Sequence, residues 1–295
     1  MTDEHDPGIP CPAVHRDVVG SLLDWGGPRL RDLPWRRTRD PWGVLVSEVM
    51  AQQTQVGRII PRWELFMERF PTPEALAEAP LADLLRLWKG LGYPRRARAL
   101  HRAAGVIAAD GAFPDSVEAL MARPGAGPRA ARAVAAFACA LDVAVVDTNV
   151  GRMLARVVGR RLRPKEAQTL ADSLVPIGDA WLWNQVVMDF GATVCTARGP
   201  GCAGCPIADR CSWAGSPERE DPARGSAGVS GPQARFDGSD RQARGRLMAA
   251  LVDGPVPARA VPEVMGRSPE VAERLATALV VEGLCRRDGD VFELG

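Results

Sequence analysis

Apolar residues recur along most of this chain at intervals of three and four positions, which is the spacing of one face of an α-helix. The segments 18–23 and 81–88 show it, with valine, leucine or tryptophan at the repeated positions. Prolines, among them Pro73, Pro114 and Pro164, interrupt these segments every ten to twenty residues or so, roughly where helices would begin. Alternating patterns typical of strands are scarce. The sequence therefore predicts an all-α fold with short connections.

The pattern changes after residue 213. Residues 214–240 are mainly Gly, Ser, Pro and charged residues, which is typical of a linker. Helical spacing then returns, and three helices are expected before the last residues alternate around an Asp-Gly turn like a β-hairpin. Residues 241–295 are therefore predicted to form a small winged-helix-like module. The alternative is a helical cap that binds no ligand.

The composition excludes several classes of protein. Of the 295 residues 46% are hydrophobic, which is enough for a sizeable core and excludes a disordered chain. The polar, proline-broken N-terminus lacks the apolar region of a signal peptide, and no segment approaches the roughly 18 apolar residues of a membrane span. A soluble cytoplasmic protein without a membrane partner is expected. The formal net charge of +1 does not by itself indicate a polyanionic partner.

The cysteines indicate a metal site. Four of the seven lie close together and follow a C-x6-C-x2-C-x5-C pattern: Cys195, Cys202, Cys205 and Cys211. In a cytoplasmic chain such a cluster predicts metal ligation rather than disulfides, and thiolates prefer iron–sulfur clusters or zinc. A lone cysteine before a C-x2-C favours iron–sulfur, and structural zinc remains the alternative. Cys11, Cys139 and Cys285 are expected to be ordinary thiols.

The residues PGAGPR, at 124–129, predict a tight hairpin before a helix. Gly125 and Gly127 permit a positive φ, so that successive backbone N–H groups can point outward near the helix N-terminus. Such a turn binds an anion, which in a helix-hairpin-helix element is a DNA phosphate. The alternative is a tight turn that binds nothing.

Two carboxylates stand at the ends of apolar runs. Asp147 follows AVV and precedes a predicted helix, where an N-cap is the simplest interpretation. Glu48 ends an apolar stretch and is followed by Gln52, Gln53 and Thr54. Taken singly, Glu48 is interpreted as a surface carboxylate and the two amides as solvated side chains. Only their combination with the hairpin and the cysteines suggests chemistry.

Together these features resemble the helix-hairpin-helix DNA glycosylases, and among them the adenine DNA glycosylases of the MutY type. The matching stretches are LPWRRTRDPWGVLVSEVMAQQT, WKGLGYPRRARAL, the hairpin, VVDTNVGRMLAR and NQVVMDFGATVCT, followed by the four cysteines. They cover roughly residues 30–213 in the order of the family. The resemblance implies a [4Fe–4S] cluster on those cysteines.

The resemblance also implies the domain organisation. A disordered N-terminal tail (1–13) would precede a helix (14–32) that packs with the cluster domain. A six-helix domain containing the hairpin (33–141) and the cluster domain itself (142–213) would follow. Double-stranded DNA with a flipped-out target base would bind between them. A monomer in the bacterial cytoplasm, associated with the nucleoid, is implied.

The catalytic roles come from the same resemblance. Glu48 matches the general acid that protonates N7 of adenine, a role that partial burial and a raised pKa would serve. Asp147 matches the ionised carboxylate that stabilises the developing positive charge of the sugar. Gln53 matches the residue that wedges into the gap left by the flipped base. The remaining matches to base- or DNA-contacting positions are Gln52, Thr54, Tyr93, Asn149 and the hairpin residues Gly125, Gly127 and Arg129.

Arg129 occupies a diagnostic position. Relatives that also cleave the backbone carry a lysine there, which forms a Schiff base; a guanidinium cannot, so a monofunctional enzyme is expected. The chain departs from the family pattern at Arg129, Ala130, Ala51 and Pro94. Ala51 is expected to open the base pocket, and Pro94 to remove an aromatic wedge.

The C-terminus departs as well, because many adenine glycosylases end in a Nudix-like domain. The short tail instead resembles those of actinobacterial members. The function implied is monofunctional excision of adenine mispaired with 8-oxoguanine or guanine, as part of base excision repair. One alternative is a glycosylase of the same scaffold that acts on mispaired thymine or uracil or on a modified base. The other is a non-catalytic iron–sulfur protein that binds DNA.

Overall fold

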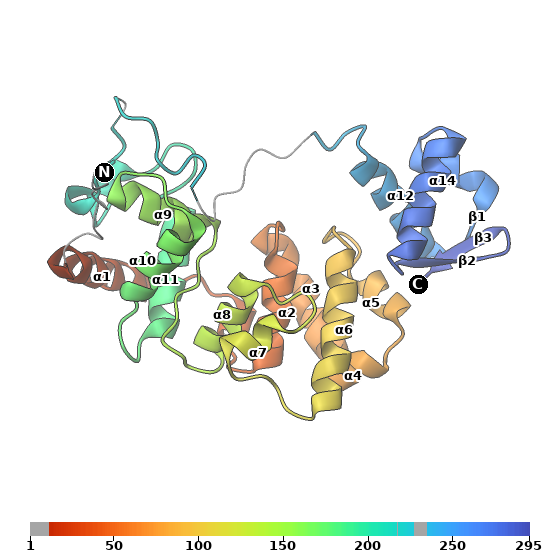
Figure 1. The fold of residues 1–295 in the computed structure, drawn as a ribbon, viewed down its shortest axis with the longest axis horizontal. Coiled ribbons are helices and arrows are strands. Elements are labelled where there is room, and N and C mark those ends of the chain that lie inside the picture. Colours follow the sequence, from red (N-terminus) through yellow and green to blue (C-terminus); the bar gives the residue numbers. More distant parts are fainter. Residues whose placement is uncertain (1–11, 217, 227–234) are drawn as a thin grey trace, which may run out of the picture. The chain divides into compact units, whose positions relative to one another are not determined.

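The computed structural model describes residues 12–216, 218–226 and 235–295 (Figure 1). The chain divides into two compact units. Unit 1 contains residues up to 32 and 131–232, and unit 2 contains residues 33–130 and 233–295. The tail predicted over 1–13 lies outside the described residues as far as residue 11, and helix α1 (Pro12–Gly26) begins directly after it. The described part is dominated by helices, so the all-α prediction is confirmed.

Helix α2 (Pro41–Ala51) is the most deeply buried helix segment of unit 2. Asp40 caps its N-terminus by accepting hydrogen bonds from the backbone N–H groups of Trp42 and Gly43, at 3.1 and 3.0 Å, and Pro41 fits the first turn. Every residue from Trp42 to Met50 is buried. α2 packs against α3 (Val56–Arg69), α6 (Arg95–Asp110) and η2 (Pro34–Arg36). A helix buried on all sides holds its side chains in fixed positions.

Short helices complete this part of unit 2. α4 (Pro73–Glu78) packs against α6, and α5 (Leu81–Leu87) packs against α3 and α6. α7 (Val117–Met121) leads through the hairpin into α8 (Pro128–Phe137). The boundary between the units falls inside α8, after Ala130, rather than at the expected residue 141. The reason is that α8 is bonded to unit 1 from there on, since Arg132 binds Asp172 and the carbonyl oxygen of Ala144.

Unit 1 is built around α11 (Ala180–Thr193), which packs against α1 and α9 (Thr148–Val158) (Figure 1). α1 and α11 approach closely, because a Cβ atom on Gly26 would lie only 2.4 Å from a methyl group of Val186. The ring of Trp25 meets that of Phe190 edge to face at 5.5 Å. α10 (Pro164–Ser173) packs against α9, and η1 (Gly27–Arg29) follows α1. The turns η3 (Cys202–Gly204) and η4 (Ala208–Arg210) lie in the cysteine segment.

The first part of the expected linker is packed instead. Both carboxylate oxygens of Asp221 accept hydrogen bonds from Arg156 on α9, and Ser226 accepts one from the backbone N–H of Leu162. Ala223 is 3% exposed. The composition of 214–240 did not reveal this, because the packing depends on a buried arginine far away in the sequence.

The C-terminal residues form the winged-helix-like module within unit 2. α12 (Asp240–Asp253), α13 (Val261–Met265) and α14 (Pro269–Val281) pack together, and η5 (Ala258–Ala260) precedes α13. The strands β1 (Val256–Pro257), β2 (Cys285–Asp288) and β3 (Val291–Leu294) form an antiparallel sheet in the order β1-β3-β2. Phe292 faces Val256 and Arg287 across the sheet and is 1% exposed. No described helix is long and apolar enough to cross a membrane.

Candidate functional site

Glu48 lies on the last part of α2, inside the buried run, and is only 8% exposed. The interpretation of Glu48 as a surface carboxylate, which its local sequence favoured, is therefore wrong. Arg129, the second residue of α8, points to it: Nη1 lies 2.8 Å from Oε2, and Nη2 donates to the backbone carbonyl of Glu48 at 3.2 Å. A buried carboxyl and a cation from the hairpin thus share one position in unit 2.

This ion pair changes the electrostatics expected at Glu48. Burial alone favours the neutral acid, but a guanidinium in contact favours the ionised carboxylate. The side chain of Arg129 is 29% exposed and that of Glu48 is 10% exposed, so water screens the pair only in part. Arg129 therefore works against the protonation that a general acid requires.

Asp147 caps α9 in unit 1. Its Oδ1 accepts hydrogen bonds from the backbone N–H groups of Asn149 and Val150, both at 2.8 Å, and its Oδ2 accepts one from the side-chain amide of Asn149 at 3.1 Å. Arg152 in turn donates to Asn149 Oδ1 at 2.8 Å and to the carbonyl oxygen of Cys195 at 2.7 Å. Both oxygens of Asp147 are therefore held in fixed directions, and the network reaches the first cysteine.

The two hairpin glycines differ in backbone conformation and in the space around them. Gly125 has φ +79°, and a Cβ atom there would lie 2.8 Å from that of Ala99, so only glycine fits. Gly127, expected to share this conformation, is not in the left-handed region, and a Cβ atom on it would meet nothing within 4 Å. Neither strain nor packing within the described chain requires glycine at 127. Glycine would be required at 127 if an external group approached this backbone closely.

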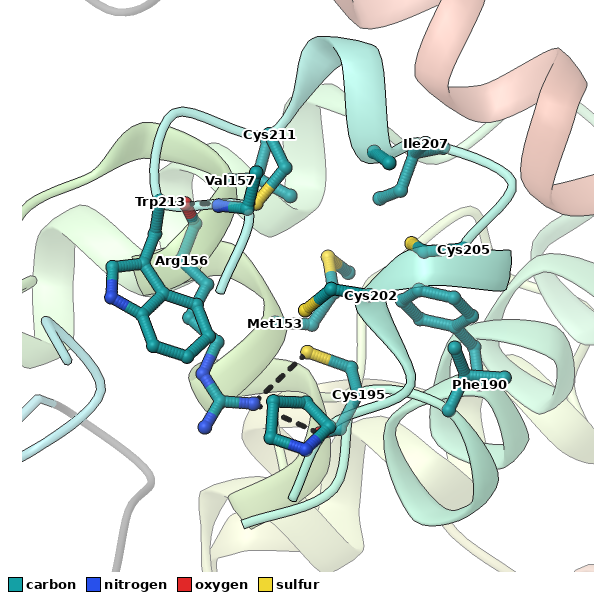
Figure 2. A pocket seen from close by; sticks show the side chains of 14 residues that line it. Met153, Arg156, Val157, Phe190, Cys195, Cys202, Cys205, Ile207, Cys211 and Trp213 are labelled. Carbon is teal, nitrogen blue, oxygen red and sulfur yellow. Dashed lines mark hydrogen bonds between the residues drawn. The ribbon is translucent and has the colours of Figure 1, made fainter. Parts of the chain in front are cut away.

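The four clustered cysteines line one pocket in unit 1 (Figure 2). None forms a disulfide, and each is partly exposed. Burial raises the pKa of the Cys195, Cys202 and Cys205 thiols, and a hydrogen bond from Arg156 partly offsets this at Cys195. Among the described residues, no three Cys, His, Asp or Glu side chains converge on the position of one metal ion.

Arg156 supplies positive charge at this pocket. It is 2% exposed, and its Nη1 donates to Cys195 Sγ at 3.4 Å and to the carbonyl oxygen of Thr196 at 2.8 Å. Its guanidinium also lies 4.6 Å from the ring centre of Trp213 (Figure 2). The backbone N–H of Ala214 donates to Cys211 Sγ at 3.3 Å. A cation and N–H groups directed at sulfur are what a negatively charged thiolate centre needs.

Several known proteins are similar to this chain in sequence. The sequence profile of the HhH-GPD superfamily of base excision DNA repair proteins matches residues 46–177. An adenine DNA glycosylase of Mycolicibacterium smegmatis is 42% identical over 91% of this chain and 92% of its own length. One of Mycobacterium tuberculosis is 44% identical over 83% of this chain and 81% of its own length.

The chain belongs to the adenine DNA glycosylase family. Solved structures support the fold: a thermostable thymine-DNA glycosylase is 28% identical, with a TM-score of 0.65 over 69% of this chain and 97% of that one. An endonuclease III in a non-covalent DNA complex is 21% identical, with a TM-score of 0.62 over 70% of this chain and 97% of that one. That likeness concerns the fold alone.

In this chain the segment after α2 is bound to the connection between α5 and α6. Thr54 donates to the carbonyl oxygen of Leu91 at 3.2 Å, and Gln52 forms the C-cap of α2. Gln53 and Tyr93 both have positive φ, +57° and +49°, which is strained for non-glycine residues. Strain of this kind is frequent at functional sites.

Arg96 is the residue that analysis of the sequence missed. Its guanidinium donates to the carbonyl oxygens of Val49, Met50 and Gln52 at the end of α2, and to those of Leu91 and Gly92. Burial lowers its pKa to about 10, so it remains charged at neutral pH. It therefore holds both strained segments together. The only feature of the sequence that pointed to Arg96 was its position in the YPRRARAL stretch.

The positions that depart from the family pattern lie in this same part of the fold. Ala51 is the last residue of α2, three residues after Glu48, and Pro94 caps the N-terminus of α6. Ala130 is 1% exposed, which leaves room for little more than a methyl group. The departures at Ala51 and Arg129 thus concern the immediate surroundings of Glu48 along α2 and at the start of α8.

Proposed function

We propose that this chain is a monofunctional base excision glycosylase that hydrolyses the N-glycosidic bond of adenine mispaired with 8-oxoguanine or guanine in double-stranded DNA. The observation that carries the proposal is the buried carboxyl of Glu48 on α2, held opposite a cation from the hairpin. The activity after which the similar proteins are named and the position of Glu48 in the matched segment support it.

Glu48 is proposed to act as the general acid. It donates a proton to N7 of the flipped adenine, which makes the base a better leaving group when the C1′–N9 bond breaks. For this step the contact with Arg129 has to be weakened, because a salt-bridged carboxylate holds no proton to donate. A phosphate of the bound DNA is the natural competitor for the guanidinium.

Asp147 is proposed to remain a carboxylate and to stabilise the positive charge that develops on the sugar. A carboxylate next to C1′ would lower the free energy of an oxocarbenium-like sugar by direct electrostatic attraction. Its bonds to the start of α9 and to Asn149 hold both oxygens in place, so little reorganisation is needed as charge develops. Water then adds to C1′ and releases one proton to solvent.

The same geometry supports the absence of a lyase step. Strand cleavage through a Schiff base needs an amine that attacks C1′, and the hairpin position nearest Glu48 holds a guanidinium instead. Arg129 cannot form that bond. The product is therefore an abasic site and free adenine, with the DNA backbone intact.

The four cysteines are proposed to hold a [4Fe–4S] cluster, with residues 142–213 as its domain. A lone cysteine before a C-x2-C pair favours an iron–sulfur cluster over structural zinc. Each cysteine of a cubane binds a different iron, so four thiolates around one pocket fit that group. The group would supply four iron–thiolate bonds that cross-link residues 195–211, directly after α11. Arg156 would balance part of the negative charge.

Double-stranded DNA with a flipped-out base is the proposed partner of a monomeric enzyme. The hairpin supports this, since Gly127 leaves its backbone open to an approaching phosphate. Flipping costs a few kcal/mol and is least costly at a mispair.

Single-turnover base release from defined duplexes tests the proposal. The duplexes carry adenine opposite 8-oxoguanine, adenine opposite guanine, and thymine or uracil opposite guanine. Release of adenine from the first two, with an intact backbone, is expected. Release only of thymine or uracil would show that the surroundings of Glu48 have changed the substrate, and release of no base would favour a non-catalytic DNA-binding role.

A further inference from the structure

A second pocket lies in unit 2, between the connection that follows α5 and helix α12 of the C-terminal module. Its cavity volume is about 920 Å³. Gln53, Trp88 and Tyr93 line one side of it, and Phe236, Arg241 and Arg244 line the other. We refer to it as the module pocket. The catalytic roles proposed above do not use its C-terminal side.

The module pocket is lined by cations. Five lining side chains are basic, and none of the described lining residues is acidic: Arg58, Lys89, Arg95, Arg241 and Arg244. Two carboxylates outside the lining pair with three of these cations: Lys89 pairs with Asp253, while Arg95 and Arg244 share Glu282. Two of these pairs join the module to the connection and to α6. Among the described residues, five cations against two carboxylates leave a net positive charge at the pocket.

Aromatic rings lie beside these cations. Tyr93 is 37% exposed and Phe236 is 51% exposed, although both rings are large and apolar. The guanidinium of Arg241 lies 5.2 Å from the ring centre of Phe236, and Arg241 donates to the Tyr93 hydroxyl at 3.3 Å. Exposed rings next to arginines can stack on nucleobases while the cations bind phosphates.

Two independent features connect this pocket to the proposed catalytic site. Gln53, which lines it, follows Glu48 by five residues, and Arg96 bonds the end of α2 to the same connection. Gln53 and Tyr93 are also two of the few described non-glycine residues with positive φ. Arg96 maintains these strained conformations in the folded chain, and backbone strain gathered at one pocket is typical of a ligand-binding site.

We propose that the C-terminal module binds DNA directly and that the module pocket takes one unstacked nucleotide of the duplex, its base on Phe236 and Tyr93 and its phosphate on Arg241. This rests on the proposed function, because a base must occupy the position at Glu48 before its neighbours reach the pocket. The nucleotide comes either from the strand opposite the target or from the target strand itself.

Fluorescence of 2-aminopurine in a bound duplex tests this on the full chain. The target is 2′-fluoro-2′-deoxyadenosine, which resists cleavage, and the probe is placed opposite the target or next to it on the same strand. We expect fluorescence to rise on binding at one of the two positions, which identifies the strand. Phe236→Ala is expected to reduce that rise at least twofold.

Affinity and its salt dependence provide the second readout. Arg241→Ala is expected to weaken binding about tenfold and to lower the slope of log Kd against log salt by about 0.9, the value for one phosphate contact. Arg241→Lys keeps the charge and should retain most of the slope. Arg259→Ala is the matched control, because Arg259 is an exposed cation of the same module outside the pocket lining.

The outcomes are distinguishable from those of the proposed function. Unchanged fluorescence and salt slope in Phe236→Ala and Arg241→Ala, with melting temperatures like that of the unmodified chain, would overturn the inference. An equal loss in Arg259→Ala would also overturn it, because the effect would then be one of general charge. Failure of the unmodified chain to release adenine would overturn the proposed function instead, whatever the pocket variants do.

Discussion

Arg129 reaches from the start of α8 to Glu48, so that a guanidinium nitrogen lies 2.8 Å from the carboxylate of the proposed acid. The contact favours the ionised form of Glu48 and places a cation at the carboxyl proposed to protonate the base. In the proposed reaction, therefore, the guanidinium of Arg129 must move away from Glu48, and the Glu48 carboxyl must bind a proton.

The first prediction concerns this pair. Arg129→Ala is expected to extend adenine release to higher pH, because a buried carboxyl without a neighbouring cation holds its proton more readily. A gain of about tenfold at alkaline pH corresponds to a shift of one pH unit. Single-turnover rates across a pH series measure it. A profile unchanged in Arg129→Ala would show that the pair does not control Glu48.

The second prediction concerns the two carboxyls. Glu48→Gln and Asp147→Asn keep the shape of each side chain but remove the proton donor and the negative charge. Each is expected to slow base release about 100-fold or more. DNA affinity, measured by fluorescence anisotropy, should change little. Normal release by either variant would exclude that residue from its role.

The third prediction concerns strand cleavage. Borohydride reduces a Schiff base to a stable covalent adduct, but a guanidinium does not form one. We expect no adduct between the enzyme and DNA on denaturing gels after borohydride treatment. Denaturing gels should also show an intact backbone until the abasic site is cleaved by alkali. An efficient covalent trap would contradict the monofunctional assignment.

The fourth prediction concerns the cysteine pocket. Gly215 has φ +71°, and a Cβ atom there would lie 2.9 Å from Cys202 Sγ. Gly215→Ala is expected to displace this sulfur and to lower both iron content and visible absorbance of the purified protein. Gly204→Ala is the control, since a Cβ atom at Gly204 meets nothing within 4 Å. Equal iron content in the two variants would contradict the assigned ligand.

The fifth prediction concerns the attachment of the C-terminal module. Hydrogen bonds from Arg95 and Arg244 lower the pKa of Glu282 to about 2. Because the folded state holds the ionised form, this stabilisation is complete above about pH 5 and is lost as the pH falls toward 2. Arg95 is largely exposed, so we expect Glu282→Gln to cost about 1 kcal/mol at pH 7.

Denaturant unfolding at several pH values measures that cost. The difference between Glu282→Gln and the unmodified chain should shrink steadily below pH 5. Asp288→Asn is the control, because Asp288 is exposed and lies outside this network. A difference that is independent of pH would show that the ion pairs do not attach the module.

Local sequence predicted most of the secondary structure and the chemical groups. Pro73 and Pro164 were expected near helix starts and Asp147 as an N-cap, and a helix begins at each of these positions in the structure. The spacing of the apolar residues predicted the all-α fold and the helices and hairpin of the C-terminal module. These features depend on residues that are close together in the chain, so they can be predicted from the sequence.

Tertiary structure decided which groups meet. Arg129 and Glu48 are far apart in the chain, and nothing in either segment shows that the guanidinium turns inward. The packing of Asp221 on Arg156, against the expected linker, has the same origin. Arg96 and the module pocket join segments distant in sequence, because buried polar groups must find partners wherever the fold brings them. The sequence alone thus determined the helices and the candidate chemistry, and only folding in three dimensions determined the pairing that governs the proposed acid.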